Sequence, residues 1–268
     1  MVIKVILLLV FFAVMLGIGF YSRKHATDVN GFVLGGRSVG PWLTAFAYGT
    51  SYFSAVVFVG YAGQFGYKYG LASTWIGIGN AVLGSLLAWV VLGRRTRIMT
   101  KHLKSMTMPD FFGKRYGSKS LRVAASMIAF IFLIPYTASV YNGLSYLFGM
   151  AFDIDFRICV VVMAVLTGVY VIVGGYMATA LNDLIQGIIM FCVIVVMPFL
   201  LISKLGGWDQ TLIQFQGVEA VKGEVFSWLP RGTAGAVDVL LLISSIGWGL
   251  GYFGQPHILT RFMAIRSS

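Results

Sequence analysis

The chain is 268 residues long, 58% hydrophobic and 11% charged, with a formal net charge of +11 and a mean hydropathy of +0.86. Soluble domains carry about 25% charged residues, so the composition excludes an ordinary water-soluble domain and indicates a membrane protein. The positive charge does not indicate a nucleic-acid partner, because its distribution along the chain is the one that membrane topology requires.

Seven apolar stretches of membrane-spanning length follow one another along the chain. About 20 helical residues cross about 30 Å of hydrocarbon, and these segments must be helical because lipid offers the backbone no hydrogen-bond partner. The expected helices cover Val5–Tyr21, Pro41–Phe65, Leu71–Leu92, Val123–Phe152, Ile158–Val173, Leu184–Leu205 and Ala236–Ile258. The fifth reaches full length only when Gly174–Ala180 is added. We therefore expect an all-α integral membrane protein, with residues 1–268 in a single transmembrane domain.

The first stretch is similar to a signal peptide in having Lys4 before an apolar run. No small-x-small cleavage site follows it, however, and Arg23 and Lys24 lie on its far side. We expect this stretch to be retained as the first membrane helix.

Basic residues gather between alternate helices. If the helices alternate in direction, fourteen of the twenty Lys and Arg fall on one side of the membrane and six on the other. Nine of the fourteen lie in the loop Gly93–Arg122, where Met108–Gly113 (MPDFFG) is expected to form a short interfacial helix begun by Pro109. Because positive charge stays cytoplasmic, we expect a multi-pass plasma-membrane protein with its N-terminus outside and its C-terminus inside.

The sequence contains no arrangement typical of catalysis or of metal binding. The three histidines, His25, His102 and His257, lack metal-ligand spacing, and both cysteines fall inside expected helices. Phosphate-loop, GxSxG and HExxH motifs do not occur in it. We expect neither an enzyme nor a bound cofactor.

Two of the expected helices are interrupted by polar residues and glycine. The second contains Tyr48–Ser54 (YGTSYFS) near its middle, and the seventh contains Gly247–Pro256 (GWGLGYFGQP). Inside a helix each glycine costs about 1 kcal/mol relative to alanine, and a proline about 3 kcal/mol. An unwound stretch frees carbonyls that coordinate Na⁺, whereas glycines in a continuous helix allow close packing. We favour close packing for Gly60–Gly70 and a broken binding helix for Gly247–Pro256.

Several strings of the sequence resemble one known family. LGGRS (Leu34–Ser38) and GWGLGYFGQPHILTRFMAI (Gly247–Ile265) are similar to the sodium:solute symporter family, and MPDFF, IPYTAS and LNDLIQG fit it in order. The longer string is most similar to the sodium/proline symporter subgroup. The resemblance implies a leucine-transporter-like fold, in which two inverted five-helix repeats follow an extra N-terminal helix. The first repeat would cover about 41–205 and the second would begin at about 236–258, so a C-terminally truncated symporter is expected.

The resemblance also implies a sodium site and a solute pocket. The backbone carbonyls of Thr50 and Phe53 fall where the family holds sodium, and the Ser54 hydroxyl lies near both sites. Tyr52 departs from the subgroup, which has an acidic residue there, so altered solute selectivity is expected. The solute pocket and its gate would comprise Ser54, Tyr136, Trp248, Tyr252, Gln255 and Pro256.

Three of the polar residues have two interpretations each. Asp183 either caps the N-terminus of the sixth helix or, as the resemblance implies, is a sodium-binding acid on the inner sodium pathway. Arg37 is either a topology signal or a gating residue at the cytoplasmic mouth of the second helix. Tyr136 follows Pro135, which should bend the fourth helix. This tyrosine is either a packing or lipid-facing residue or, as the resemblance implies, part of the solute pocket.

The function that the resemblance implies is sodium-coupled import of a small organic solute, an amino acid such as proline, by alternating access. Na⁺ would be the coupling ion, and the partners would be the solute, Na⁺ and the lipid bilayer. The alternative is a non-transporting fragment, or a solute-sensing membrane module of the same fold.

Overall fold

The computed structural model describes residues 2–52, 63–217 and 256–266. The regular elements of these residues are all helices, and an isolated parallel bridge joins Val39 to Ile265. Four of the helices that the structure describes are long and apolar enough to cross a membrane, which agrees with the expected all-α membrane protein. They are Val2–His25, Gly63–His102, Lys119–Phe152 and Phe156–Lys204.

The chain divides into two compact units. The first unit comprises Met1–Val56, Gly93–Gly187 and Pro256–Ser268, and the second comprises Val57–Leu92 and Ile188–Gln255. The residues of the candidate site described below all belong to the first unit.

The first unit opens with α1 (Val2–Ser22), which coincides with the first expected helix. A turn of 3₁₀ helix (Arg23–His25) leads to α2 (Val29–Leu34). Asp28 caps α2, since its Oδ1 accepts a hydrogen bond from the Gly31 N–H at 3.0 Å.

The GGR turn, Gly35–Arg37, connects α2 to α3 (Pro41–Tyr52). All three of its residues have positive φ angles, of 58°, 64° and 57°. Glycine adopts such angles readily and arginine seldom does, so the conformation of Arg37 depends on the contacts that its side chain makes. Of the second expected helix, residues 53–62 lie outside the described part of the chain.

The basic loop folds into two short helices, α6 (Arg94–His102) and α7 (Met108–Tyr116), which precede the long α8 (Lys119–Phe152). Thr107 caps α7 by accepting a hydrogen bond from the Asp110 N–H at 3.3 Å, and Pro109 lies in the first turn. The short helix predicted at MPDFFG is therefore confirmed. The helix α8 continues through Pro135 as a single element.

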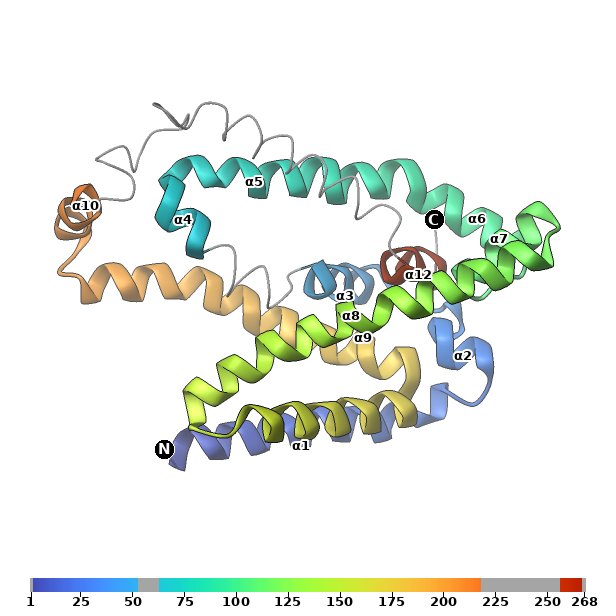
Figure 1. Ribbon diagram of the computed structural model, residues 1–268, viewed down its shortest axis with the longest axis horizontal. Coiled ribbons are helices and arrows are strands. Elements are labelled where there is room, and N and C mark those ends of the chain that lie inside the picture. Colours follow the sequence, from blue (N-terminus) through green and yellow to red (C-terminus); the bar gives the residue numbers. More distant parts are fainter. Residues whose placement is uncertain (1, 53–62, 218–255, 267–268) are drawn as a thin grey trace. The chain divides into compact units, whose positions relative to one another are not determined.

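The fifth and sixth expected helices are the two arms of α9 (Phe156–Lys204), which meet at Gly175 with φ 59° and ψ −151°. Figure 1 shows the α9 ribbon turning back at this point after running beside α1. A Cβ atom on Gly175 would lie 3.0 Å from the Phe32 carbonyl oxygen of α2. The backbone angle and this close approach both require glycine here.

The position of this turn corrects one interpretation of Asp183. The chain reverses at Gly175, so Asp183 lies eight residues inside the second arm of α9 and is not its N-cap. The residues Tyr176–Ala180, which the sequence pattern assigns to the end of the fifth helix, lie beyond the reversal and begin the second arm. The N-cap interpretation is therefore wrong.

The last described helix, α12 (Pro256–Ala264), contains the end of the seventh expected helix. We expected that helix to end at Ile258, but α12 continues to Ala264, so the predicted end is wrong. The residues after Ile258 are helical because they are buried: Phe262, Met263 and Ala264 are each 0% exposed. Ala264 packs with Tyr176 and Ala180 of α9 in the core of the first unit.

The second unit contains a helical run from α4 (Gly63–Tyr69) through a 3₁₀ turn (Gly70–Ser73), α5 (Thr74–Gly79) and two π-helical stretches, Asn80–Leu86 and Trp89–Gly93. The third expected helix is thus present. The second unit also holds the end of α9 and the short α10 (Trp208–Gln216). Residues 218–255, with most of the seventh expected helix, lie outside the described part of the chain.

Candidate functional site

A buried ion pair lies where three helices of the first unit meet. The Arg261 Nη2 of α12 lies 2.6 Å from the Asp183 Oδ2 of α9. The two side chains are only 10% and 22% exposed. The same Nη2 donates a hydrogen bond to the Ser51 hydroxyl of α3 at 3.1 Å. One guanidinium group therefore connects α12 to both α9 and α3.

An aromatic ring supports the same arginine. The guanidinium carbon of Arg261 lies 5.1 Å from the centre of the Tyr176 ring, within the range of a cation–π contact. Tyr176 is only 9% exposed and follows the Gly175 turn directly. The turn that reverses α9 thus also places the ring beneath the ion pair.

Close packing brings α3 to this site. A Cβ atom on Gly187, one helical turn beyond Asp183, would lie 2.8 Å from Phe46 and 3.0 Å from Thr50 of α3. The absence of a side chain at Gly187 allows this approach, which brings Thr50 of α3 beside the stretch of α9 that carries Asp183. The predicted sodium residues Thr50 and Asp183 are therefore neighbours in the structure.

The two charges of the site depend on each other. Burying both charges costs several kcal/mol each unless they remain paired, and removing one partner of a buried pair costs about 3–5 kcal/mol. Arg261 neutralises the Asp183 carboxylate while the three helices stay together.

Arg37 has several partners at the end of the GGR turn. Its Nη2 donates to the Ser105 carbonyl oxygen at 2.6 Å and to the Thr100 carbonyl oxygen at 3.3 Å. Its Nη1 donates to the Met263 carbonyl oxygen of α12 at 3.4 Å. Burial, and then the charge of Arg97, lower the pKa of Arg37, but a guanidinium stays protonated at neutral pH.

A second arginine, Arg97 of α6, holds the residues that follow α12. Its Nε donates to the Ile265 carbonyl oxygen at 2.6 Å, and its Nη2 to the Arg266 carbonyl oxygen at 3.4 Å. Carbonyls at a helix C-terminus carry partial negative charge, which cations stabilise. We call Arg37 and Arg97 together the arginine clamp, since both bind carbonyl oxygens at the end of α12.

The structure describes some of the predicted site residues and not others. Thr50 and Asp183 lie at the ion pair, and Arg37 lies in the arginine clamp. Tyr136 lies on α8, 41% exposed, and takes part in none of the contacts above. Pro256 begins α12. The remaining predicted residues lie outside the described part of the chain: Phe53, Ser54, Trp248, Tyr252 and Gln255.

Sequence reasoning missed the cation of the ion pair. Arg261 stands in the string that carries the family resemblance, but it was counted only as a topology signal after the seventh helix. An arginine five residues beyond Pro256, in an otherwise apolar helix end, needs a partner when buried. Asp183, an acid at the edge of the expected sixth helix, is the natural candidate for that partner.

Comparison with known proteins gives one family and several relatives within it. Residues 32–268 match the sodium:solute symporter family. The sodium/proline symporters of Staphylococcus aureus strains JH9 and JH1 are each 36% identical to the chain over 266 residues. The matched region is 98% of this chain and 50% of each relative, so the chain spans about half the length of these curated relatives.

Proposed function

Because this chain belongs to the sodium:solute symporter family, we propose that it provides the sodium-binding part of a secondary symporter that imports a small organic solute. The first candidate solute is an amino acid such as proline, since the relatives above are sodium/proline symporters. We propose for it the inverted-repeat fold of leucine-type transporters, with the first repeat over about 41–205 and the second beginning at about 236–258.

The observation that carries this proposal is the buried pair of Asp183 and Arg261. It joins α3, α9 and α12, and among the proposed site residues Thr50 lies on α3, Asp183 on α9 and Pro256 at the start of α12. A charged pair inside membrane-spanning helices is costly and is usually retained for function. Its position supports a role in opening and closing the inner side of the transport path.

The proposed sodium site uses oxygen atoms near this pair. The carbonyls of Thr50 and Phe53, the Ser54 hydroxyl and the Asp183 carboxylate would contact Na⁺ on its way through the protein. Oxygen ligands suit a small, hard cation. Because Asp183 is also the partner of Arg261, sodium at the carboxylate would weaken the contact that holds α12.

The proposed solute pocket takes its residues from the second expected helix, α8 and the seventh expected helix. Ser54, Tyr136, Trp248, Tyr252, Gln255 and Pro256 would line it. Trp248 and Tyr252 are four residues apart, so they share a face wherever the chain is locally helical. An aromatic face beside freed backbone groups suits a zwitterion with an apolar body. Tyr52, where the proline subgroup has an acid, is expected to alter solute selectivity.

Alternating access would then proceed through the arginine clamp and the ion pair. With both intact, the end of α12 is fixed and the inner path is closed. Sodium and solute arriving from outside would bind at the broken helices, and release of Arg261 and of the clamp would open the path inward. The inward sodium gradient supplies the free energy.

Uptake of labelled proline tests the proposal, in cells without proline transport of their own that express the protein at its full natural length. We expect uptake with Na⁺ that disappears when choline replaces it. Asp183→Asn is expected to raise the Na⁺ concentration for half-maximal uptake about tenfold, or about 1.4 kcal/mol. Asp110→Asn removes a carboxylate whose cation partners, Lys114 and Arg122, are exposed, and as the control it should leave this concentration unchanged.

Absence of sodium-dependent uptake for proline and a panel of amino acids, with the protein present in the membrane, would contradict transport. It would favour the alternative of a solute-sensing module, for which binding without transport is expected.

A further inference from the structure

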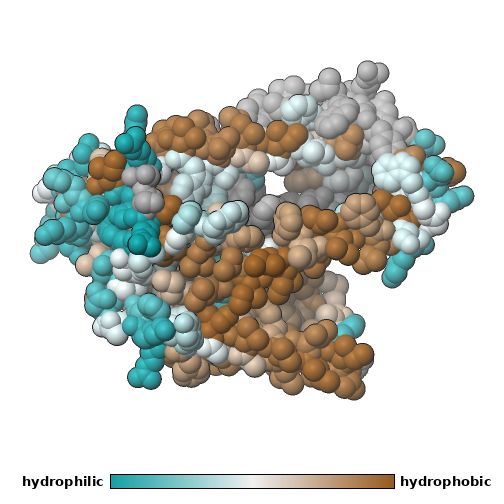
Figure 2. Space-filling view, turned by 180° about the vertical axis from the view of Figure 1, so that it is seen from behind, coloured by the Kyte–Doolittle hydropathy of each residue, from teal (hydrophilic) through white to brown (hydrophobic). Residues whose placement is uncertain are grey.

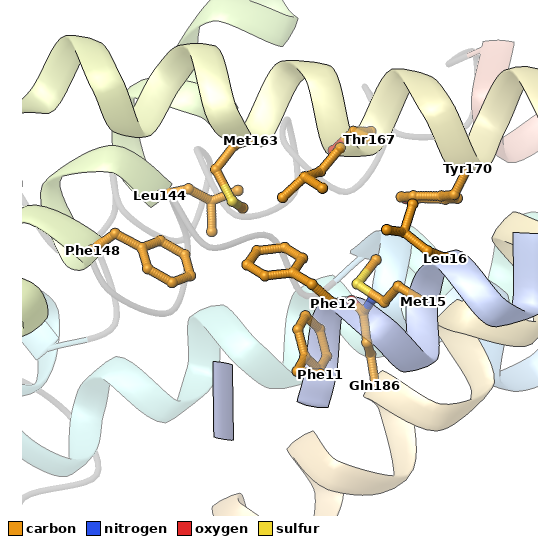
Figure 3. Close-up of a pocket in the computed structure, with 11 residues that line it drawn as sticks. Phe11, Phe12, Met15, Leu16, Leu144, Phe148, Met163, Thr167, Tyr170 and Gln186 are labelled. Atoms are coloured by element: carbon orange, nitrogen blue, oxygen red, sulfur yellow. The ribbon is translucent and has the colours of Figure 1, made fainter. Parts of the chain in front are cut away.

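An apolar cavity lies among α1, α8 and α9 of the first unit (Figure 3). Its volume is about 290 Å³, at the lower end of the range of about 300–1,000 Å³ for small-molecule sites. Protein interiors contain few voids larger than a water molecule, and apolar cavities of this size can take up apolar ligands. The lining residues are Phe11, Phe12, Met15, Leu16, Leu144, Phe148, Met163, Leu166, Thr167, Tyr170 and Gln186.

The chemistry of the lining excludes most occupants. None of its residues is charged, so an amino-acid zwitterion would lose its water without gaining an ionic partner. Water in a cavity needs two to four polar partners, but polar side chains lie only at one end, at Thr167, Tyr170 and Gln186 (Figure 3). Gln186 Nε2 already has a weak acceptor in the Met15 sulfur at 3.8 Å. Hydrocarbon fits the rest of the lining.

The position of the cavity indicates where that hydrocarbon comes from. Phe12 lies ten residues from each end of α1 (Val2–Ser22), which is the middle of a membrane-spanning helix. The surrounding surface is apolar and exposed: Val14 is 44% and Val165 58% exposed. Figure 2 shows the face on which α1 lies, at the lower right of the view, covered mostly by hydrophobic residues. In the middle of a bilayer, lipid acyl chains surround such a surface.

The lining side chains are half-buried, whereas their neighbours along the helices point outward. Leu166 lines the cavity and is partly covered, while the adjacent Val165 is exposed. The cavity is partly open, so a tail enters without displacing a helix. We propose that this cavity is a binding site for the acyl chain of a bilayer phospholipid, held among α1, α8 and the first arm of α9.

Bound lipid gives α1 an indirect contact with α8. The direct packing of α1 is against α9, where a Cβ atom on Gly174 would lie 2.7 Å from the Gly19 carbonyl oxygen. An acyl chain touching Phe12 of α1, Leu144 of α8 and Leu166 of α9 fills the remaining space. The site therefore stabilises the position of α1, the helix that precedes the proposed repeat.

Mass spectrometry of the protein after extensive detergent washing tests this proposal. We expect the unmodified protein to retain a phospholipid molecule. Leu166→Trp fills the cavity and is expected to abolish retention, whereas Val165→Trp, one residue away on the lipid-facing surface, is the matched control and keeps it. Leu144→Trp should repeat the loss from a second helix, with the exposed Met150→Trp as its control. Circular dichroism verifies that each variant keeps its helix content.

Two results would overturn the proposal. One is an unmodified protein that retains no phospholipid, or folded Leu166→Trp and Leu144→Trp variants that retain as much as their controls. The other is obtained by comparing the 268-residue chain with a longer chain that contains it. If the 268-residue chain retained phospholipid and the longer chain did not, the cavity would be filled by protein and not by lipid. Neither result depends on transport, so the proposal is tested separately from the proposed symport.

Discussion

At the scale of single residues, charge pairing distinguishes two kinds of acid in the described part of the chain. Asp183 is paired with Arg261 where both side chains are largely covered by three helices. Asp110 is itself only 13% exposed, but its two cations lie at the surface: Lys114, at 2.8 Å, is 41% exposed and Arg122, at 3.5 Å, is 59% exposed. Surface pairs contribute about 0–1 kcal/mol, so only the first pair is expected to matter for stability.

Removing Arg261 alone is expected to destabilise the protein strongly. Arg261→Ala leaves the Asp183 carboxylate buried without its cation, which costs about 3–5 kcal/mol. Thermal unfolding in detergent should show a clear fall in Tm, partly restored in the double variant Arg261→Ala/Asp183→Asn because no unpaired charge remains. Asp110→Asn should change Tm little. A double variant no more stable than Arg261→Ala would mean that packing, and not charge, holds α12.

At the scale of helices, glycine determines where α9 reverses and how closely α1, α2 and α3 approach it. Gly175 makes the turn against α2, Gly174 meets α1, and Gly187 meets α3. These three contacts fix the arms of α9 against the other helices of the first unit. The position of Tyr176 and Asp183 relative to Arg261 follows from them.

Replacing Gly175 is expected to disturb both the turn and the ion pair. In Gly175→Ala, the alanine backbone would have to adopt φ 59° and its Cβ would lie 3.0 Å from Phe32, so a fall in Tm and in expression is predicted. Gly168→Ala, in the first arm of α9, is the matched control because nothing lies within 4 Å of the added Cβ. Equal Tm values for the two variants would contradict the requirement for glycine at the turn.

The arginine clamp is expected to keep the end of α12 buried. Ala264 is 0% exposed, so a cysteine placed there should react slowly with a maleimide in a protein whose native cysteines are replaced. Adding Arg97→Gln removes the bonds to the Ile265 and Arg266 carbonyls and should speed this reaction severalfold. Adding Lys101→Gln, an exposed residue of the same helix, should not. Equal labelling rates would show that the clamp does not restrain α12.

The helix ends that sequence predicted best are those with local signals. The α7 helix was expected from Pro109, and Thr107 and Gly117 do cap it. The turn in α9 was placed too late, because Gly175 reverses the chain within an apolar stretch while the polar Asn182 and Asp183 lie inside the second arm. Polarity marks loops only where they meet water, and tertiary contacts form this turn. The pairing of Asp183 with Arg261 depends on helix packing, which no spacing in the sequence reveals.

At the scale of the whole molecule, the arrangement in the membrane follows from the distribution of basic residues. Fourteen of twenty Lys and Arg fall on one side if the helices alternate, and most of these lie in Gly93–Arg122. The structure folds this loop into α6, α7 and the start of α8, with the basic residues Arg94, Lys104, Lys114 and Arg115 exposed. We propose that this surface faces the cytoplasm.

Cysteine labelling in sealed cells tests this orientation. Starting from a protein with its native cysteines replaced, Lys104→Cys should be protected from a membrane-impermeant maleimide until the cells are opened. Lys204→Cys, an exposed position at the end of α9, is expected to react from outside. Reaction at position 104 in intact cells would contradict the predicted orientation.

The turn at Gly175 also has a consequence for how the protein enters the membrane during its synthesis. The stretch from Gly174 to Asn182 contains no lysine or arginine, so the α9 hairpin carries no charge signal of its own where its arms meet. We expect its two arms to follow the direction set by the helix before them. Lys119 and Arg122 stand at the start of that helix, α8. Three consecutive crossings of the bilayer therefore take their orientation from one basic cluster, so neutralising it is expected to invert all three as a block.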